Sequence, residues 1–275
     1  MIQTRRMTVE DLNTVLDWAA EEGWNPGLDD PAVFLQTDPD GFFLALDGDQ
    51  PVAAISVVNH SDDFSFLGLY ICRASHRGRG IGLALWTEAL EHAGARTVGL
   101  DGVQDQQANY ARSGFRHAGG TTRYSGTLAG YDHRAALPVE PADVMRLVVL
   151  EAGASGWEKR RYLQGWFTDT AHRKTFVVSE GERITGFATV RACRDGAKIG
   201  PLSALDEATA LVLLEKCADV FAGEIIVDVP SSSDLLNDIC NELGLVPGFQ
   251  TARMYRGPSQ PGASRLFAVA SLELG

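Results

Sequence analysis

The sequence is poor in cysteine and has none of the spacings that hold a metal. Its four cysteines form no Cys-x-x-Cys pair, and each falls in an apolar pattern typical of a strand or helix: Cys72, Cys193, Cys217 and Cys240. We therefore expect buried free thiols rather than disulfides. The six histidines show no ligand-like spacing to one another or to the cysteines, so we expect no metal.

Long hydrophobic runs are also absent. No segment approaches the roughly 18 apolar residues that would span a bilayer, and the first residues lack the apolar run of a signal peptide. We expect a cytoplasmic protein that has no membrane partner.

Positive charge is scarce. The chain has 24 Lys and Arg against 36 Asp and Glu, which gives a formal net charge of −12. Such a surface repels polyanions, which argues against nucleic-acid binding and weakly favours a cationic substrate, although an acidic balance also simply keeps a protein soluble. The 275 residues, 45% of them hydrophobic, suffice for a sizeable core in two domains or one large one.

Glycine and arginine, by contrast, are concentrated in one stretch. Residues 69–72 form an apolar run with strand character, residues 77–82 read Arg-Gly-Arg-Gly-Ile-Gly, and a helical pattern follows. The first N–H groups of such a helix have no partner within it, and the helix dipole places positive charge there. Glycines let the backbone approach a ligand closely, and Arg77 and Arg79 add charge. The stretch predicts a strand, loop and helix that bind a pyrophosphate.

Two other glycine-rich loops fit this stretch poorly. A P-loop needs a lysine and a Ser or Thr after its last glycine, and neither follows here. A dinucleotide fingerprint needs a third glycine where Leu83 stands, although Asp101 lies near the acidic position roughly 20 residues further on.

The order Arg/Gln-x-x-Gly-x-Gly/Ala, realised over residues 77–82, instead resembles the acyl-coenzyme A binding motif of the GNAT superfamily of N-acyltransferases. The resemblance implies an α+β fold, an α/β mixed sheet that is mostly antiparallel, twisted and flanked by helices, with acetyl-CoA as co-substrate. It implies coenzyme contacts from Tyr70, Ile71, Cys72, Arg77, Gly78, Arg79, Gly80, Ile81, Gly82, Leu83 and Asn109.

The strand before the loop has a specific role in the family. It carries a bulge and splays from its neighbour, so that its free N–H and C=O groups pair with the pantetheine arm. The resemblance assigns this pairing to the backbone of Tyr70, Ile71 and Cys72, and assigns one N–H to stabilising the thioester oxyanion. The Cys72 thiol as a covalent nucleophile is disfavoured, because no histidine lies at a suggestive spacing.

A second motif follows the loop. Residues 109–115, Asn-Tyr-Ala-Arg-Ser-Gly-Phe, resemble the family's Tyr-x-x-x-Gly-Phe, with Gly114 as the helix C-cap. In the family this tyrosine protonates the departing thiolate, so Tyr110 is the candidate general acid; the alternative is a tyrosine packed on the helix with its hydroxyl in water. The family's asparagine, about two helical turns earlier, is replaced by Val103 and Gln104, and Asn109 or Gln104 could substitute for it.

The acceptor site is expected near the end of the first helix. Residues 21–27, Glu-Glu-Gly-Trp-Asn-Pro-Gly, resemble a subgroup of bacterial GNAT proteins with a second, GNAT-like C-terminal domain. Glu22 or Glu21 could accept a proton or hold an ammonium group, with Trp24 and Phe34 as an apolar wall. A solvated helix end is the alternative for the two glutamates.

The second half repeats the order of elements of the first. Residues 175–190 read as strand, turn and strand, and residues 197–202 as a further strand, followed by helix, strand and helix to residue 243. Where the first half has arginines, residues 203–207 offer carboxylates, which would repel a pyrophosphate. We predict a catalytic GNAT domain at residues 1–130 and, at residues 131–275, a GNAT-like domain without a phosphate loop that shapes the acceptor pocket or an interface.

These expectations lead to one enzymatic hypothesis. The chain moves an acetyl group from acetyl-CoA to a primary amine by direct attack in a ternary complex, in which Tyr110 protonates the sulfur. An ordinary lysine-like amine has a pKa near 10.4, so a base or a water chain must first remove a proton, and Asp62 and Asp63 are further candidates for it. We expect the acceptor to be a small-molecule or peptide amine. The chain could also form a homodimer. The alternative is a non-catalytic acyl-CoA-binding sensor or adaptor.

Overall fold

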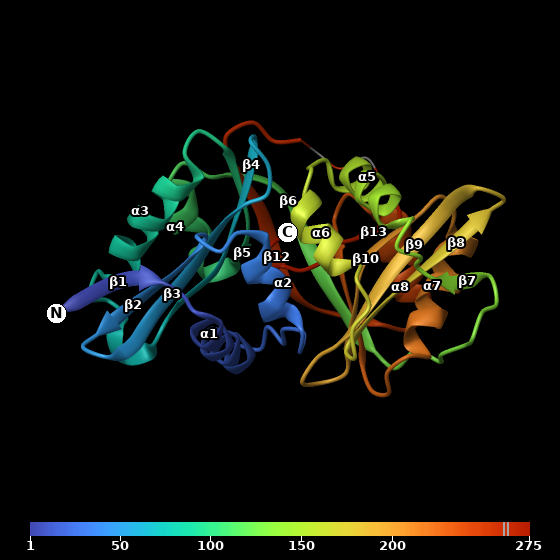
Figure 1. Ribbon diagram of the computed structural model, residues 1–275, viewed down its shortest axis with the longest axis horizontal. Coiled ribbons are helices and arrows are strands. Elements are labelled where there is room, and N and C mark those ends of the chain that lie inside the picture. The colour runs from blue at the N-terminus through green and yellow to red at the C-terminus, as the bar shows by residue number, and fades with distance from the viewer. Residues whose placement is uncertain (261, 263) are drawn as a thin grey trace.

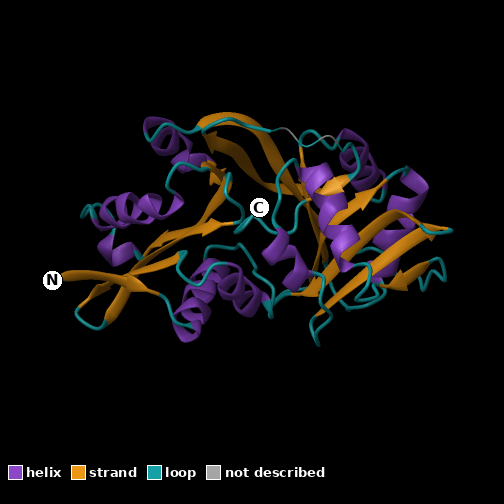
Figure 2. Cartoon of the chain, turned by 45° about the horizontal axis from the view of Figure 1, so that its top comes forward, coloured by secondary structure: helices purple, strands orange, loops and turns teal. Residues whose placement is uncertain are grey.

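The computed structural model describes residues 1–260, 262 and 264–275. Within these residues one continuous mixed sheet runs through both halves of the chain, with helices packed on both of its faces (Figures 1 and 2). The first half contributes β1 (Ile2–Arg6), α1 (Val9–Glu21), α2 (Asp30–Thr37), β2 (Phe42–Asp47), β3 (Gln50–Asn59), β4 (Phe64–Cys72), α3 (Ile81–Ala93), β5 (Thr97–Val103), α4 (Gln107–Arg112) and β6 (Arg116–Gly126).

The second half repeats much of this order. It contributes β7 (Ala136–Pro138), α5 (Val144–Ser155), α6 (Arg160–Trp166), β8 (Arg173–Glu180), β9 (Arg183–Ala192), β10 (Ala197–Ala204), α7 (Glu207–Ala218), β11 (Ile225–Pro230), α8 (Asp234–Glu242), β12 (Val246–Arg256) and β13 (Phe267–Ala268). The α+β class and the two tandem GNAT-like units predicted from the sequence are thereby confirmed in their element order.

The two halves exchange a strand at the centre of the sheet. The strand order is β1-β2-β3-β4-β5-β12-β6-β11-β10-β9-β8-β7, so β12 of the second half lies next to β5 and β6 of the first half lies next to β11 (Figure 1). Residues 122–125, which lie within the predicted first domain, pair with β11 and β12 of the second half. The domain boundary at residue 130 stays a prediction. β6, which precedes it in the chain, pairs with β11, and β12, which follows it, pairs with β5.

Three apolar cores hold the sheet to its helices. One lies between β2 to β5 and the helices α3 and α4, and includes Met254 of β12; a second lies under α7 and α8, and includes Tyr124 of β6. The third joins α1 and α2 to α5 and α6, with the rings of Phe34 and Trp166 stacked 6.4 Å apart. Because two of these cores include an exchanged strand and the third joins helices of both halves, each of the three is built from both halves of the chain.

A buried ion cluster reinforces the contact between the halves. Asp30, at the start of α2, accepts a hydrogen bond from Arg173 of β8 at 3.0 Å and lies 3.3 Å from the Arg191 guanidinium of β9. Both guanidinium groups also lie over the Trp166 ring. All three charged side chains are almost fully buried. The attraction between the carboxylate and the two guanidinium groups must therefore offset the cost of removing their charges from water.

Residues 267–269 occupy the opening between β10 and β11 in the second half. Parallel pairing of β10 and β11 ends at Ile199 and Val227, and beyond that point β13 pairs with β10 while the N–H of Val269 donates to Asp228 of β11 at 3.0 Å. Gly200 makes room for this segment, since a Cβ there would lie 2.0 Å from the Val269 carbonyl oxygen. In the second half the space between the diverging strands β10 and β11 is thus occupied by residues of the same chain. In the first half the corresponding strands, β4 and β5, also stop pairing partway along.

Membrane-spanning helices and metal-binding clusters were searched for among the described residues. In that part of the chain no helix is long and apolar enough to cross a membrane. The same residues contain no group of three or more His, Cys, Asp or Glu side chains that could hold a metal ion. The four cysteines are free thiols.

Candidate functional site

The strand β4 bends away from β5 in the middle of the first half. Their parallel pairing ends at Leu67 and Leu100, while β4 continues to Cys72. A shift of register against β3 falls at the same place, where Leu69 has a positive φ of 48°. A bulge of this kind bends a strand and leaves backbone groups unpaired. The bulge and splay predicted for this strand are confirmed.

A glycine-rich loop connects β4 to α3, as the sequence predicted. Gly78 and Gly80 have φ values of 74° and 79°, in the left-handed region that side chains with a Cβ rarely adopt, and Gly80 is the N-cap of α3. A Cβ at either position would meet nothing within 4 Å, so the loop lies open. The free N–H groups of the first turn of α3 face this opening, where they can bind an anion.

A groove runs along this loop and the free edge of β4. It has a volume of about 1170 Å³ including open solvent. The residues that line it include most of the predicted coenzyme contacts, namely Tyr70, Ile71, Cys72, Arg77, Gly78, Gly80, Ile81, Gly82 and Leu83. Arg79 lies beside the groove, with its guanidinium 3.8 Å from Asp47.

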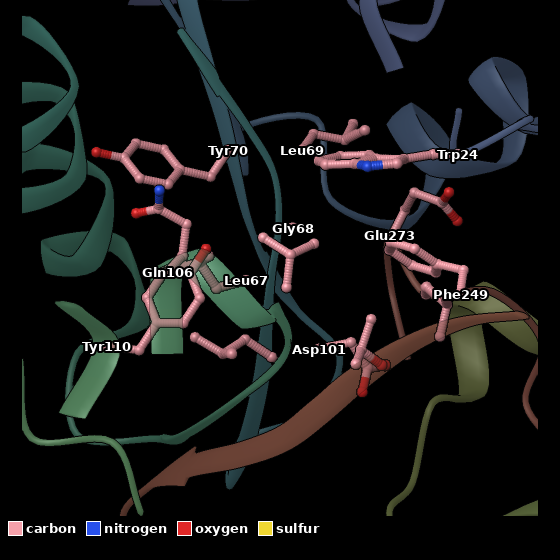
Figure 3. Close-up of a pocket in the computed structure, with 14 residues that line it drawn as sticks. Trp24, Leu67, Gly68, Leu69, Tyr70, Asp101, Gln106, Tyr110, Phe249 and Glu273 are labelled. Atoms are coloured by element: carbon pink, nitrogen blue, oxygen red, sulfur yellow. The ribbon is translucent and has the colours of Figure 1, made fainter. Parts of the chain in front are cut away.

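The inner end of the groove opens into a pocket between the two halves. Four residues line both spaces: Trp24, Tyr70, Val103 and Gln106. The pocket has a volume of about 590 Å³ including open solvent. Figure 3 shows Tyr70, Gln106 and Tyr110 on one side of it and Trp24, Phe249 and Glu273 on the other. A molecule in the groove and a molecule in the pocket would therefore meet beside the bulge of β4.

Tyr110 lies on the wall of this pocket. Its ring stacks on Trp86 of α3 with centroids 5.4 Å apart, and it packs so closely on β5 that a Cβ at Gly102 would lie 2.8 Å from the ring. Burial, reinforced by the neighbouring Tyr70, raises the pKa of Tyr110 well above its usual value. The hydroxyl therefore stays protonated at neutral pH, the state that a proton donor needs.

An amide reaches the pocket from a position that the sequence analysis missed. Gln106 lines both the groove and the pocket, whereas Asn109 is exposed and its amide donates to Gln106 Oε1 at 2.7 Å. The structure therefore places Asn109 behind Gln106 rather than in the groove. The sequence signal was weak, because the short turn before α4 changes which side chain faces inward.

The two glutamates at the end of α1 lie at the loop rather than in the pocket. Glu22 accepts a hydrogen bond from Arg77 at 2.7 Å, and Glu21 accepts one from Arg73 at 2.6 Å. Arg77 also donates to the carbonyl of Cys72 at 2.8 Å. The Glu22 carboxylate, a candidate base, is thus bonded to an arginine of the glycine-rich loop, and Glu21 lines neither space.

Three further candidates lie elsewhere in the fold. Phe34 is fully buried against Trp166 in the core that joins the halves, so it does not form a wall of the pocket. Asp62 and Asp63 lie in the turn between β3 and β4, at the end of β4 opposite the loop, where Asp62 is fully exposed. Burial raises the pKa of the Cys72 thiol despite the nearby arginines, so a thiolate nucleophile there is disfavoured.

Trp24, in contrast, lies in the pocket wall and is held there by the second half. Its backbone carbonyl accepts hydrogen bonds from Lys198 of β10 at 2.7 Å and from Arg123 of β6 at 3.1 Å. Arg123 is fixed in turn by two hydrogen bonds to Asp228 of β11, at 2.8 and 2.9 Å. Two buried cations, Lys198 from the second half and Arg123 from the exchanged strand β6, therefore hold the backbone of Trp24 in place.

Two carboxylates line the pocket. Asp101 of β5 is bonded through both oxygens to Arg253 of β12, at 2.9 and 2.7 Å. Glu273 is 4% exposed, and its buried Oε2 has no hydrogen-bond partner among the described residues. Its backbone oxygen lies so close to β4 that a Cβ at Gly68 would be 2.0 Å from it. The sequence analysis missed Glu273, because residues 271–275 carry no motif.

Comparisons with known families and proteins agree with this geometry. The Acetyltransferase (GNAT) family matches residues 9–115, and an Acetyltransferase (GNAT) domain matches residues 147–268. The holothin acyltransferase of Pseudoalteromonas sp. (strain SANK 73390) is 31% identical over 276 residues, which cover 98% of this chain and 92% of that protein.

Two solved structures have the same arrangement of elements. A putative acetyltransferase from Pyrococcus horikoshii superposes with a TM-score of 0.85 at 19% identity and covers 100% of this chain and 96% of its own. A tandem GNAT protein from the clavulanic acid biosynthesis pathway superposes with a TM-score of 0.62 at 16% identity, covering 94% and 100%. At these identities the likeness concerns the fold alone.

Proposed function

Because this chain belongs to the GNAT family of acyltransferases, with two GNAT domains in tandem, we propose that it is an N-acetyltransferase that moves an acetyl group from acetyl-CoA to a primary amine. Both substrates bind together, and the amine attacks the thioester directly. The family uses acyl-CoA; the choice of acetyl-CoA and of an amine acceptor is the proposal.

The groove fits an acyl-CoA in three respects. Gly78 and Gly80 leave the loop open, the first turn of α3 presents free N–H groups, and Arg77 adds positive charge beside them. This combination suits a diphosphate. Among the described strands, none pairs with β4 beyond Leu67 on its β5 side, so this part of β4 can pair with an extended amide-bearing arm.

When bound, acetyl-CoA supplies an acyl thioester. The residues of the chain then hold the thioester and stabilise the charges that develop on its oxygen and sulfur. A backbone N–H of residues 70–72 donates to the thioester oxygen as negative charge develops there. The Tyr110 hydroxyl, kept protonated by its burial, gives its proton to the departing sulfur. Trp24 and Phe249 limit the water that reaches the inner end of the groove.

The observation that supports this proposal best is the continuity of the groove with the pocket, since Tyr70, Val103 and Gln106 line both and Tyr110 lines the inner one. This arrangement brings a loop-bound thioester to a protonated hydroxyl and to a separate space for an acceptor. A groove that served only to bind acyl-CoA would not need that second space.

The test measures binding and transfer separately. We expect acetyl-CoA to bind in calorimetry and to release free thiol only when an amine is present. Arg77→Glu and Gly80→Val should abolish the binding, because the first repels the diphosphate and the second strains a left-handed backbone. Binding without thiol release across a broad amine panel would identify an acyl-CoA sensor, and release in buffer alone would identify a thioester hydrolase.

A further inference from the structure

We propose that Glu273 binds the amine of the acceptor and takes its proton, and that the acceptor is a small molecule whose amine is attached to a flat apolar body. This inference rests on the proposed function, because it assigns the acceptor side of the same site.

The Glu273 carboxylate is buried and is not paired with any described side chain. Its buried Oε2 has no hydrogen-bond partner among the described residues, and no described Lys, Arg or His nitrogen lies within 4.0 Å of the carboxylate. Burying a carboxylate without a partner is costly. A group that compensates this cost must come from outside the chain and must donate hydrogen bonds or carry positive charge.

The nearby cations are bonded to other groups. Arg123 is bonded to Asp228, Lys198 to the carbonyl of Trp24, and Arg191 to the carbonyl of Ala270. Each of these cations is bonded to another group, and none of them donates a described hydrogen bond to Glu273. The Glu273 carboxylate therefore has no cationic side chain bonded to it in the pocket.

Other carboxylates near the reaction site are already paired. Asp101, the second carboxylate of the pocket, is bonded to Arg253 through both oxygens, and Glu22, in the groove, is bonded to Arg77. A carboxylate that must take a proton from a substrate needs a free oxygen. Of the two carboxylates in the pocket, Glu273 alone meets this requirement among the described contacts.

The walls of the pocket define the body that carries the amine. Figure 3 shows the Glu273 carboxylate near the rings of Trp24 and Phe249, and Leu69, Leu100 and Leu272 complete an apolar lining. A space lined by two aromatic rings suits a flat small molecule. A polypeptide would need a longer open channel.

The proton and bond changes balance with these groups. Glu273 first takes a proton from the bound ammonium group and passes it to solvent, which leaves a neutral amine. As this amine attacks, a C–N bond forms at the thioester carbonyl and the C–S bond breaks. One amine proton passes to Glu273, and the sulfur takes the proton of Tyr110. Solvent carries the proton from Glu273 back to Tyr110, so the net products are an amide and a free thiol.

The experiment uses the full chain, acetyl-CoA and three amine probes: tryptamine, spermidine and a short lysine-containing peptide. Thiol release gives kcat and KM for each amine, calorimetry gives the affinity for acetyl-CoA, and the thermal midpoint reports folding. The variants are Glu273→Gln, which keeps the shape and removes the charge, and Glu242→Gln, the same change on an exposed position of α8.

We expect tryptamine to be the best of the three acceptors. Glu273→Gln should lower kcat/KM for tryptamine by roughly 10²–10⁴-fold, the usual contribution of a positioned acid or base, with acetyl-CoA affinity and thermal midpoint unchanged. Glu242→Gln should match the wild type in every measurement. An effect on kcat and KM for the amine alone separates a role at the acceptor from a structural role.

The outcomes distinguish this inference from the proposed function. Equal tryptamine turnover by Glu273→Gln and the wild type would overturn the role of Glu273. Acetyl-CoA binding with turnover of spermidine or the peptide but not of tryptamine would overturn the acceptor class, as would turnover of none of the three. A wild type that does not bind acetyl-CoA would overturn the proposed function itself.

Discussion

The ammonium group of Lys198 donates a hydrogen bond to the backbone carbonyl of Trp24 at 2.7 Å. Lys198 belongs to β10 of the second half, and Trp24 follows α1 of the first. Burial, together with the neighbouring Arg123, lowers the pKa of Lys198. Burying the charged form of this side chain therefore costs free energy. The contact shows how the second half holds a residue of the pocket wall in place.

Lys198→Met should loosen Trp24 without unfolding the chain. Methionine fills a similar volume and removes a buried charge, so we expect a small change in thermal midpoint. Loss of one charged hydrogen bond, worth about 1.5 kcal/mol, should raise KM for the amine roughly tenfold while acetyl-CoA affinity stays constant. Lys174→Met, at a half-exposed position of β8, is the matched control. An unchanged amine KM would show that Trp24 is positioned by other contacts.

Tyr110→Phe tests the proton donor. The ring would keep its stacking on Trp86, so the fold and the groove should be preserved. We expect kcat to fall by roughly 10²–10⁴-fold while acetyl-CoA affinity in calorimetry stays the same. Because burial raises the pKa of Tyr110, wild-type kcat should also show no alkaline decrease from this group up to about pH 10. Unchanged turnover by the variant would remove Tyr110 from the mechanism.

How much of this could be predicted from the sequence depends on how local each signal is. The strand, loop and helix around Gly78 and Gly80 follow from neighbouring residues, because glycine spacing and apolar periodicity act within a few positions. The same is true of the short helix of Tyr110. The bulge of β4 and the repeated second half were predicted from family resemblance and element order.

The remaining features depend on contacts between distant residues. The sequence of β6 has the pattern of a strand, but nothing in it specifies that it pairs with β11 rather than β5. Phe34 has the character of a pocket wall, but Trp166, far along the chain, buries it in the core. Glu273 follows no motif, and its importance comes from a fold that brings residues 271–275 against Gly68.

Gly68→Ala tests that close approach. A Cβ at position 68 would lie 2.0 Å from the backbone oxygen of Glu273, so either β4 or residues 271–275 must move. We expect a lower thermal midpoint and a loss of amine turnover larger than the loss of acetyl-CoA affinity. Gly153→Ala is the control, because a Cβ there meets nothing within 4 Å, and alanine should stabilise α5 by about 0.5–1 kcal/mol. Normal turnover by Gly68→Ala would show that Glu273 need not stay in place.

The ion pair of Arg123 with Asp228 predicts how stability depends on pH. Burial alone would raise the pKa of Asp228, but the Arg123 guanidinium outweighs it and holds the pKa below its usual value of about 3.9. Below that pH the unfolded chain binds more protons than the folded one, so this stabilisation is present above about pH 4 and is lost as the pH falls through the folded pKa. The difference in thermal midpoint between the wild type and Asp228→Asn should therefore narrow in acid. A constant difference would contradict this assignment.

A crystal structure with acetyl-CoA would locate the coenzyme and its acetyl group relative to the pocket. We expect the diphosphate at the N–H groups of residues 78–83, the pantetheine arm along residues 70–72 of β4, and the acetyl group at the pocket wall, between Tyr110 and Glu273. Coenzyme bound between β10 and β11 of the second half, coenzyme elsewhere on the surface, or an acetyl group that points away from Tyr110 would contradict direct transfer at this site.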